Sequence, residues 1–119
     1  MVTLHVFIST GRFRTLEEMR NYIDETYTED GDGIPSEFIE EVELDEYEPG
    51  CIEAFPSETG KPVPLAQLVA GASWSDQWLK SFDGTAMADA AICVFSPNVV
   101  ENPSNCSLQY LGTCDFMPT

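Results

Sequence analysis

The run AAICVFSP, residues 90–97, begins with six consecutive apolar residues and ends at a proline. A short continuous apolar run bounded by turn residues is typical of a strand buried in the centre of a sheet. The N-terminal stretch VTLHVFIST alternates instead, with one face made of Val2, Leu4, Val6 and Ile8. This alternation predicts a second strand that turns one face to the core. The fold is therefore expected to be organised around a sheet.

Helix signals separate these two strands. Thr15 followed by Glu18 forms a capping box and predicts a helix from Leu16 to about Thr26. Ser36 is a candidate N-cap for the next helix, in IPSEFIEEVEL. Two further helical pieces are expected, one starting at Pro64 and one in SWSDQWLKSF, capped by Ser73 or Ser75.

Two more strands complete the predicted order. CIEAFP predicts a short strand at Cys51–Phe55, and CSLQYLGTCDF predicts a last strand that forms a hairpin with AAICVF. The order β, α, α, β, α, α, β, β predicts an α+β fold. We expect one small domain over residues 1–119, with a mostly antiparallel sheet of about four strands and helices packed on one face.

Charge is concentrated in one part of the chain. The net charge is −16, and the segment from Glu17 to Glu58 contains sixteen of the 21 acidic residues but a single basic residue, Arg20. The net −15 of this segment exceeds the magnitude of roughly 2–8 that keeps a small domain soluble. It argues against nucleic-acid binding, which needs a basic surface, and favours a basic protein partner. A solvated face without a partner is the alternative.

The stretch YTEDGDGIPSEFIEE suggests a calcium loop, but its spacing does not fit one. With Gly33 as the central glycine of an EF-hand, the first and last ligand positions fall on Thr28 and Ile39. The chain has four cysteines: Cys51, Cys93, Cys106 and Cys114. No two of them are spaced closely enough to predict a zinc site. We expect them to be reduced thiols, and we expect no metal site and no cofactor.

Catalytic and membrane signals are weak. The only histidine, His5, lies on a predicted strand, where a structural role is the first expectation and a hydrolase using nearby acids is an alternative. No apolar run approaches the length of a membrane span, and the N-terminus has no signal-peptide pattern, so a cytoplasmic protein is expected.

Trp74 and Trp78 lie four residues apart on one helix face. For these two side chains, packing in the core is favoured over an exposed role in contact with a partner.

Several blocks resemble the immunity protein 22 family of bacterial polymorphic toxin systems. They occur in the same order over nearly the whole chain: VFISTGRFRTLEEMRNYID, YTEDGDGIPSEFIEEVELDEYEPGCIEAF, LVAGASWSDQWLKSF, AAICVFSPNV and LQYLGTCDF. The resemblance implies a cytoplasmic antidote that binds a cognate toxin domain, in some systems a nuclease, and blocks it without turnover. Ile34 and Phe38, in the IPSEF block, are then expected to anchor the turn to the core.

The charge and the resemblance together predict a toxin-binding surface. Its candidate residues are Glu29, Asp30, Asp32, Glu37, Glu40, Glu41, Asp45 and Glu46. Their expected role is to pair with Lys and Arg on the toxin and to accelerate the encounter. The alternative is an acidic adaptor, regulator or nucleic-acid mimic that binds another basic protein. Neither reading fixes the oligomeric state.

Overall fold

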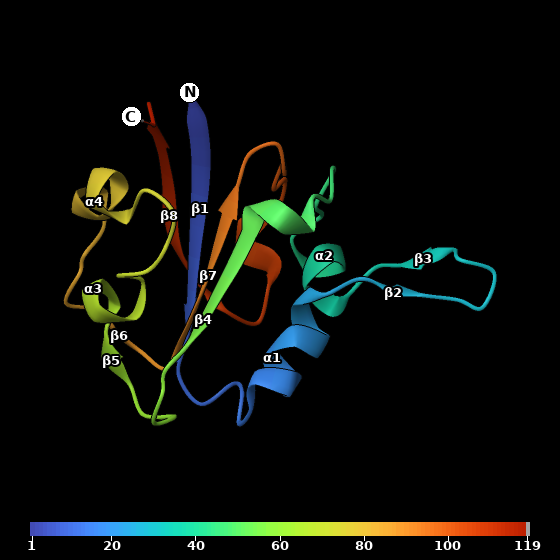
Figure 1. Ribbon diagram of the computed structural model, residues 1–119, viewed down its shortest axis with the longest axis horizontal. Helices are drawn as coiled ribbons and strands as arrows, with labels where there is room; N and C mark the ends of the chain where they lie inside the picture. The colour runs from blue at the N-terminus through green and yellow to red at the C-terminus, as the bar shows by residue number, and fades with distance from the viewer. Residues whose placement is uncertain (119) are drawn as a thin grey trace.

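One antiparallel sheet forms the centre of the molecule. The computed structural model describes residues 1–118, and its main strands follow the order β4-β7-β1-β8 (Figure 1). Their bounds are Val2–Ser9 (β1), Ile52–Pro56 (β4), Ala90–Phe95 (β7) and Gln109–Phe116 (β8). The predicted α+β class and four-stranded antiparallel sheet are confirmed. Every residue of β7 is buried, as its apolar run predicts.

Helices cover both faces of this sheet. Figure 1 shows α1 (Leu16–Ile23) and α2 (Glu37–Glu41) on one side, with α3 (Leu65–Leu68) and α4 (Ser75–Trp78) on the other. The prediction that helices pack on one face is therefore wrong. The physical reason is that β1 buries a large apolar side chain on each face: Val6 packs towards α3 and α4, Phe7 packs towards α1 and α2, and both are fully buried.

The last strand does not form a hairpin with β7. Instead, β8 and β7 both pair with β1, one on each side of it. The connection from Ser96 to Leu108 is much longer than the two to five residues of a typical hairpin loop, and it includes the 3-10 turn η3 (Pro103–Asn105). The predicted hairpin is therefore wrong, because β1, with Val6 and Phe7 buried on opposite faces, lies between β7 and β8.

The helix starts follow their capping signals in part. The Thr15 hydroxyl accepts a hydrogen bond from the Glu18 amide at 3.1 Å, and the Ser36 hydroxyl accepts one from the Ile39 amide at 3.2 Å. Both caps are as predicted. Helix α4 differs, because its N-cap is Trp74 in a left-handed conformation (φ 55°), without a side-chain cap from either predicted serine.

The remaining elements are short. Helix α1 ends at Ile23, earlier than predicted, because the chain then enters β2 (Thr26–Tyr27), which pairs with β3 (Gly33–Ile34). A second small pair joins β5 (Val63–Pro64) to β6 (Met87–Ala88). The 3-10 turn η1 (Pro49–Cys51) comes directly before β4. A second 3-10 turn, η2 (Leu79–Ser81), continues the chain after α4.

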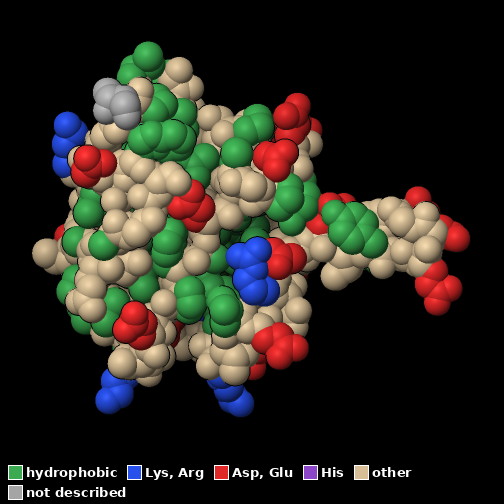
Figure 2. All heavy atoms as spheres, in the orientation of Figure 1, with side chains coloured by type: hydrophobic (Ala, Val, Ile, Leu, Met, Phe, Trp, Pro, Cys, Tyr) green, Lys and Arg blue, Asp and Glu red, His purple; other side chains and the backbone are tan. Residues whose placement is uncertain are grey.

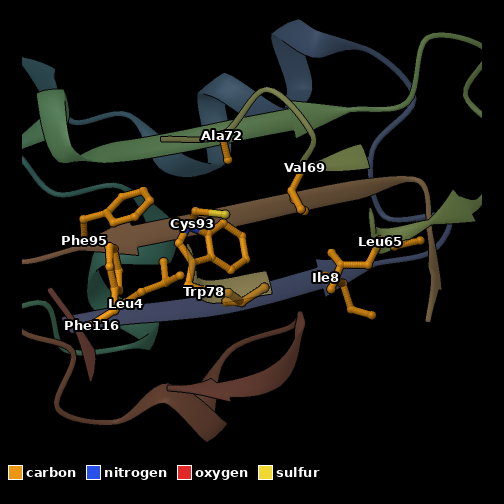
Figure 3. Packing of buried hydrophobic residues seen from close by; sticks show 12 residues of the cluster. Leu4, Ile8, Leu65, Val69, Ala72, Trp78, Cys93, Phe95 and Phe116 are labelled. Carbon is orange, nitrogen blue, oxygen red and sulfur yellow. The ribbon is translucent and has the colours of Figure 1, made fainter. Parts of the chain in front are cut away.

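Figure 3 shows the apolar cluster on the face covered by α3 and α4. Trp78 from α4 lies over Leu4 of β1 and Cys93 of β7, and it is fully buried. The other face is filled by aromatic packing, with Phe7 edge-on to Phe38 at 5.2 Å between ring centroids. No helix within residues 1–118 is long and apolar enough to cross a membrane.

Candidate functional site

The acidic segment includes a hairpin that projects from the body of the molecule. We call residues 25–35, which contain β2 and β3, the arm. Figure 1 shows the arm extending from the side of the sheet that carries α1 and α2. All four residues of its two strands are exposed. Figure 2 shows acidic side chains at the tip of the arm, and the arm contains no Lys or Arg.

The tip of the arm is an ordered turn. The Thr28 amide donates to the Asp32 carbonyl at 2.9 Å, and the Gly31 amide donates to the Thr28 carbonyl at 3.0 Å. The Thr28 hydroxyl in turn accepts from the Asp32 amide at 3.1 Å. Gly31 has a φ of +87°, a conformation that glycine adopts without a steric penalty. These bonds use the backbone and Thr28, so the side chains of Glu29, Asp30 and Asp32 remain exposed to solvent.

Two large apolar side chains lie next to these acids. Tyr27 is 65% exposed and Ile34 is 46% exposed. The expectation that Ile34 anchors the turn to the core is therefore wrong, because the arm carries Ile34 away from the sheet; Phe38, the other predicted anchor, is fully buried. The carboxylate of Glu25, close to the Tyr27 hydroxyl, raises the pKa of that phenol. The arm thus presents apolar area beside negative charge.

Two of the predicted contact acids on α2 have hydrogen-bond partners elsewhere in the chain. Glu37 accepts a hydrogen bond from the Arg12 guanidinium at 2.9 Å. Glu41 accepts from the Tyr22 hydroxyl and, at 3.2 Å, from the Ser107 amide. Burial, followed by the bond to Glu41, raises the pKa of Tyr22. Both carboxylates therefore have partners in neighbouring segments, although the Glu37 side chain is still 59% exposed.

The other three predicted acids lie on and after α2. Glu40, Asp45 and Glu46 are exposed, and none forms an ion pair with a basic residue among residues 1–118. The backbone of Asp45 is fixed, since its amide donates to the Val99 carbonyl at 2.9 Å. Together with the tip of the arm, these residues form two exposed acidic groups on the same side of the sheet.

The structure adds acids that the predicted surface omitted. Glu43 and Glu48 are exposed in the same turn, and Glu43 has a φ of +52°. The only base of the acidic segment, Arg20, is already paired with Asp24 at 2.7 Å. The run of acids in the sequence was the available signal for Glu43 and Glu48. Apart from the pairs Arg12–Glu37 and Arg20–Asp24, the acids on this side have no ion-pair partner among residues 1–118.

The candidate metal and nucleophile residues do not assemble into a site. Within residues 1–118, no group of three or more His, Cys, Asp or Glu side chains is arranged to hold a metal ion. Cys93 is buried in β7, and burial raises the pKa of its thiol, which keeps the thiol protonated and unreactive. The stretch that suggested a calcium loop, residues 27–41, forms most of the arm and then α2.

His5 has a structural hydrogen bond. Its Nδ1 lies 2.9 Å from the Tyr110 hydroxyl, on the strand next to it in the sheet. Burial lowers the pKa of His5 below its ordinary value of 6.5, and the nearby carboxylate of Asp115 only partly opposes this shift. The neutral imidazole is therefore the form that the folded protein favours.

The lowered pKa of His5 predicts that the folded protein loses stability in acid. The unfolded chain protonates His5 below pH 6.5 more readily than the folded protein does, so unfolding takes up a proton there. Replacing His5→Asn removes that titration. We expect the free energy of unfolding of the wild type to fall relative to His5→Asn as the pH drops below 6.5. Urea titrations of both proteins at several pH values measure the difference, and a constant difference would contradict the assignment.

Fold and surface together define a small acidic α+β protein with the features of a binding protein, an exposed charged side and a projecting arm. The family model described as Immunity protein 22 matches residues 6–116 of the 119-residue chain. The chain belongs to this family, as its sequence blocks indicated. Membership supports an immunity role in general and suggests inhibition by binding a cognate toxin, without catalysis. Searches among curated proteins and among solved structures found no match.

Proposed function

We propose that this chain neutralises a cognate bacterial toxin in the cytoplasm by stoichiometric binding, with its exposed acids facing a basic surface of the toxin. The observation that carries the proposal is the uncompensated charge on the side of α1, α2 and the arm. The segment Glu17–Glu58, which forms α1, α2 and the arm before it enters β4, contains sixteen acids and one base, Arg20, which is paired with Asp24. A basic nucleic-acid cleft of a nuclease toxin has the matching charge.

The arrangement suits rapid capture. Complementary charge can raise association rates from about 10⁵–10⁶ to 10⁸–10⁹ M⁻¹s⁻¹ at low salt. Speed matters for an antidote, because free toxin acts on the cell until it is bound. In this proposal Glu29, Asp30 and Asp32 make the first approach from the arm, while Glu40, Asp45 and Glu46 bind nearer the body. Glu37 and Glu41 act indirectly, by fixing α2.

Apolar contact would complement the charge. Tyr27 and Ile34 lie directly beside the acids of the arm, and aromatic side chains are enriched among residues that dominate binding energy. Trp74, 39% exposed, is a second exposed aromatic, but it packs on Phe95 and Phe116 in the cluster under α3 and α4, on the other face of the sheet from α1 and α2. We therefore assign the apolar contact to the arm.

Co-expression with the toxin domain encoded beside this chain tests the proposal. We expect the two proteins to copurify, the toxin to lose activity at a one-to-one ratio, and the association rate to fall steeply with added salt. An acidic adaptor or nucleic-acid mimic would instead leave the neighbouring toxin active and copurify with another basic protein. If the complex forms but its association rate does not change with salt, the immunity role stands and the proposed pairing of the acids with a basic toxin surface is refuted.

A further inference from the structure

Strand β8 leaves one edge of the sheet open. On one side β8 pairs with β1, and within residues 1–118 no strand pairs with its other side. Its eight residues contain neither proline nor lysine, two residue types that commonly protect edge strands. An open edge presents unpaired backbone N–H and C=O groups, which are a template for another strand.

A β-bulge limits which part of this edge can accept a strand. The register with β1 shifts after Val6, which pairs with Gly112, whereas Phe7 pairs with Tyr110, so Leu111 is left without a partner. Gly112 follows the bulge with a φ of +140°. The regular run is therefore Gly112–Phe116, whose central residue is Cys114.

Charge favours this edge for contact between two copies of the chain. The segment Gln109–Phe116 has one charged residue, Asp115, and the Thr3 hydroxyl donates to its carboxylate at 2.6 Å. The opposite edge of the sheet, β4, carries Glu53 and is flanked by Glu48 and Glu58. Two molecules of charge −16 therefore meet with least repulsion at β8, where their acidic segments lie outside the contact.

A hollow next to the run provides room for side chains. It has a volume of about 450 Å³ and lies between the end of β8 and the segment of α4 and η2. From β8 and its end, the hollow is lined by Cys114, Asp115, Phe116 and Met117, and from the α4–η2 segment by Asp76, Gln77, Lys80 and Ser81. Met117 is 63% exposed. A strand added to β8 would cover the apolar part of this lining, Phe116 and Met117.

We propose that a second copy of this chain pairs with β8, antiparallel along Gly112–Phe116, about a two-fold axis at Cys114. The sheets of the two copies then become continuous. In this register Cys114 of one copy faces Cys114 of the other, and Thr113 faces Asp115, so no like charges are opposed. The acidic side and the arm remain free, and the dimer does not depend on the proposed toxin binding.

Sedimentation velocity over a dilution series of the purified chain tests the dimer. We expect a reversible dimer that strengthens with added salt, because salt screens the repulsion between the acidic molecules. A short bis-maleimide should link the two Cys114 thiols. Cys114→Ser should remain dimeric but lose the cross-link. A wild type that is monomeric throughout, or a cross-link that persists in Cys114→Ser, would overturn the proposal.

A matched pair of variants tests the register. Thr113→Glu and Thr113→Lys both remove the hydroxyl that donates to the Leu4 carbonyl, so they share this loss within the fold. In the proposed register, residue 113 of one copy faces Asp115 of the other copy. A glutamate at this position repels the Asp115 carboxylate, whereas a lysine attracts it. The two-fold axis repeats this contact, so it occurs twice in each dimer. We expect the dimer dissociation constant of Thr113→Glu to exceed that of Thr113→Lys about tenfold. Thr10→Glu and Thr10→Lys, at an exposed loop position, are controls. Equal constants for the Thr113 pair would refute this register.

Discussion

Glu29→Lys combined with Asp30→Lys is expected to slow association with the toxin by about 10- to 100-fold at low salt, since these acids are proposed to steer the encounter. The loss should shrink as salt is added. Dissociation should change less, because exposed charges act mainly on the association rate. Stopped-flow or surface-based kinetics at several salt concentrations measure both rates.

The same pair should leave the fold intact. Both side chains are exposed, and the hydrogen bonds of the turn involve Thr28, Gly31 and the backbone of Asp32. Surface substitutions of this kind change the free energy of unfolding by about 0.5 kcal/mol or less. A kinetic loss can therefore be assigned to binding rather than to unfolding.

A control with the same charge change separates local charge from total charge. Glu58→Lys combined with Asp76→Lys also replaces two exposed acids, one in the loop after β4 and one on α4. We expect this control to slow association much less than the pair on the arm. Equal effects would mean that only net charge matters, and no effect of either pair would remove the arm from the interface.

Trp78→Ala is expected to destabilise the protein by about 3–5 kcal/mol, a large part of the roughly 5–15 kcal/mol by which native proteins are stable. Trp78 is fully buried, its indole N–H donates to the Ser73 carbonyl at 2.8 Å, and its ring meets Phe82 edge-on at 5.8 Å. Truncation would leave a cavity and remove the hydrogen bond that fixes the segment before α4. Urea unfolding followed by circular dichroism measures the loss.

Trp74→Ala is the matched control for this prediction. Trp74 is the neighbouring tryptophan, but 39% of it is exposed, so less apolar area is lost on truncation. We expect a clearly smaller loss of stability than for Trp78→Ala. Equal losses would show that the packing of Trp74 on Phe95 and Phe116 stabilises α4 as much as the buried ring does.

Much of the local structure could be predicted from the sequence. The caps at Thr15 and Ser36, the buried strand β7 and the α+β class follow from short-range patterns, because each depends on residues a few positions apart. The family resemblance was also visible in the order of the blocks. The hairpin between the last two strands was predicted wrongly, since strand order depends on which strand buries both faces.

The candidate surface was predictable only in its charge. The sequence places all eight predicted acids in one segment but treats them as equivalent. The structure separates them: Glu37 and Glu41 are bound to Arg12 and Tyr22, whereas Glu29, Asp30 and Asp32 project on the arm. These differences arise from partners distant in the sequence, and no local pattern encodes them.

The kinds of elements, the family and the location of the negative charge could therefore be read from the amino-acid sequence. These properties reside in composition and in neighbours along the chain. The two covered faces, the inner position of β1, the exposure of Ile34 and the open edge of β8 became visible only in the folded protein. Each of these depends on which distant segments meet, because burial and strand pairing are set by contacts across the whole chain.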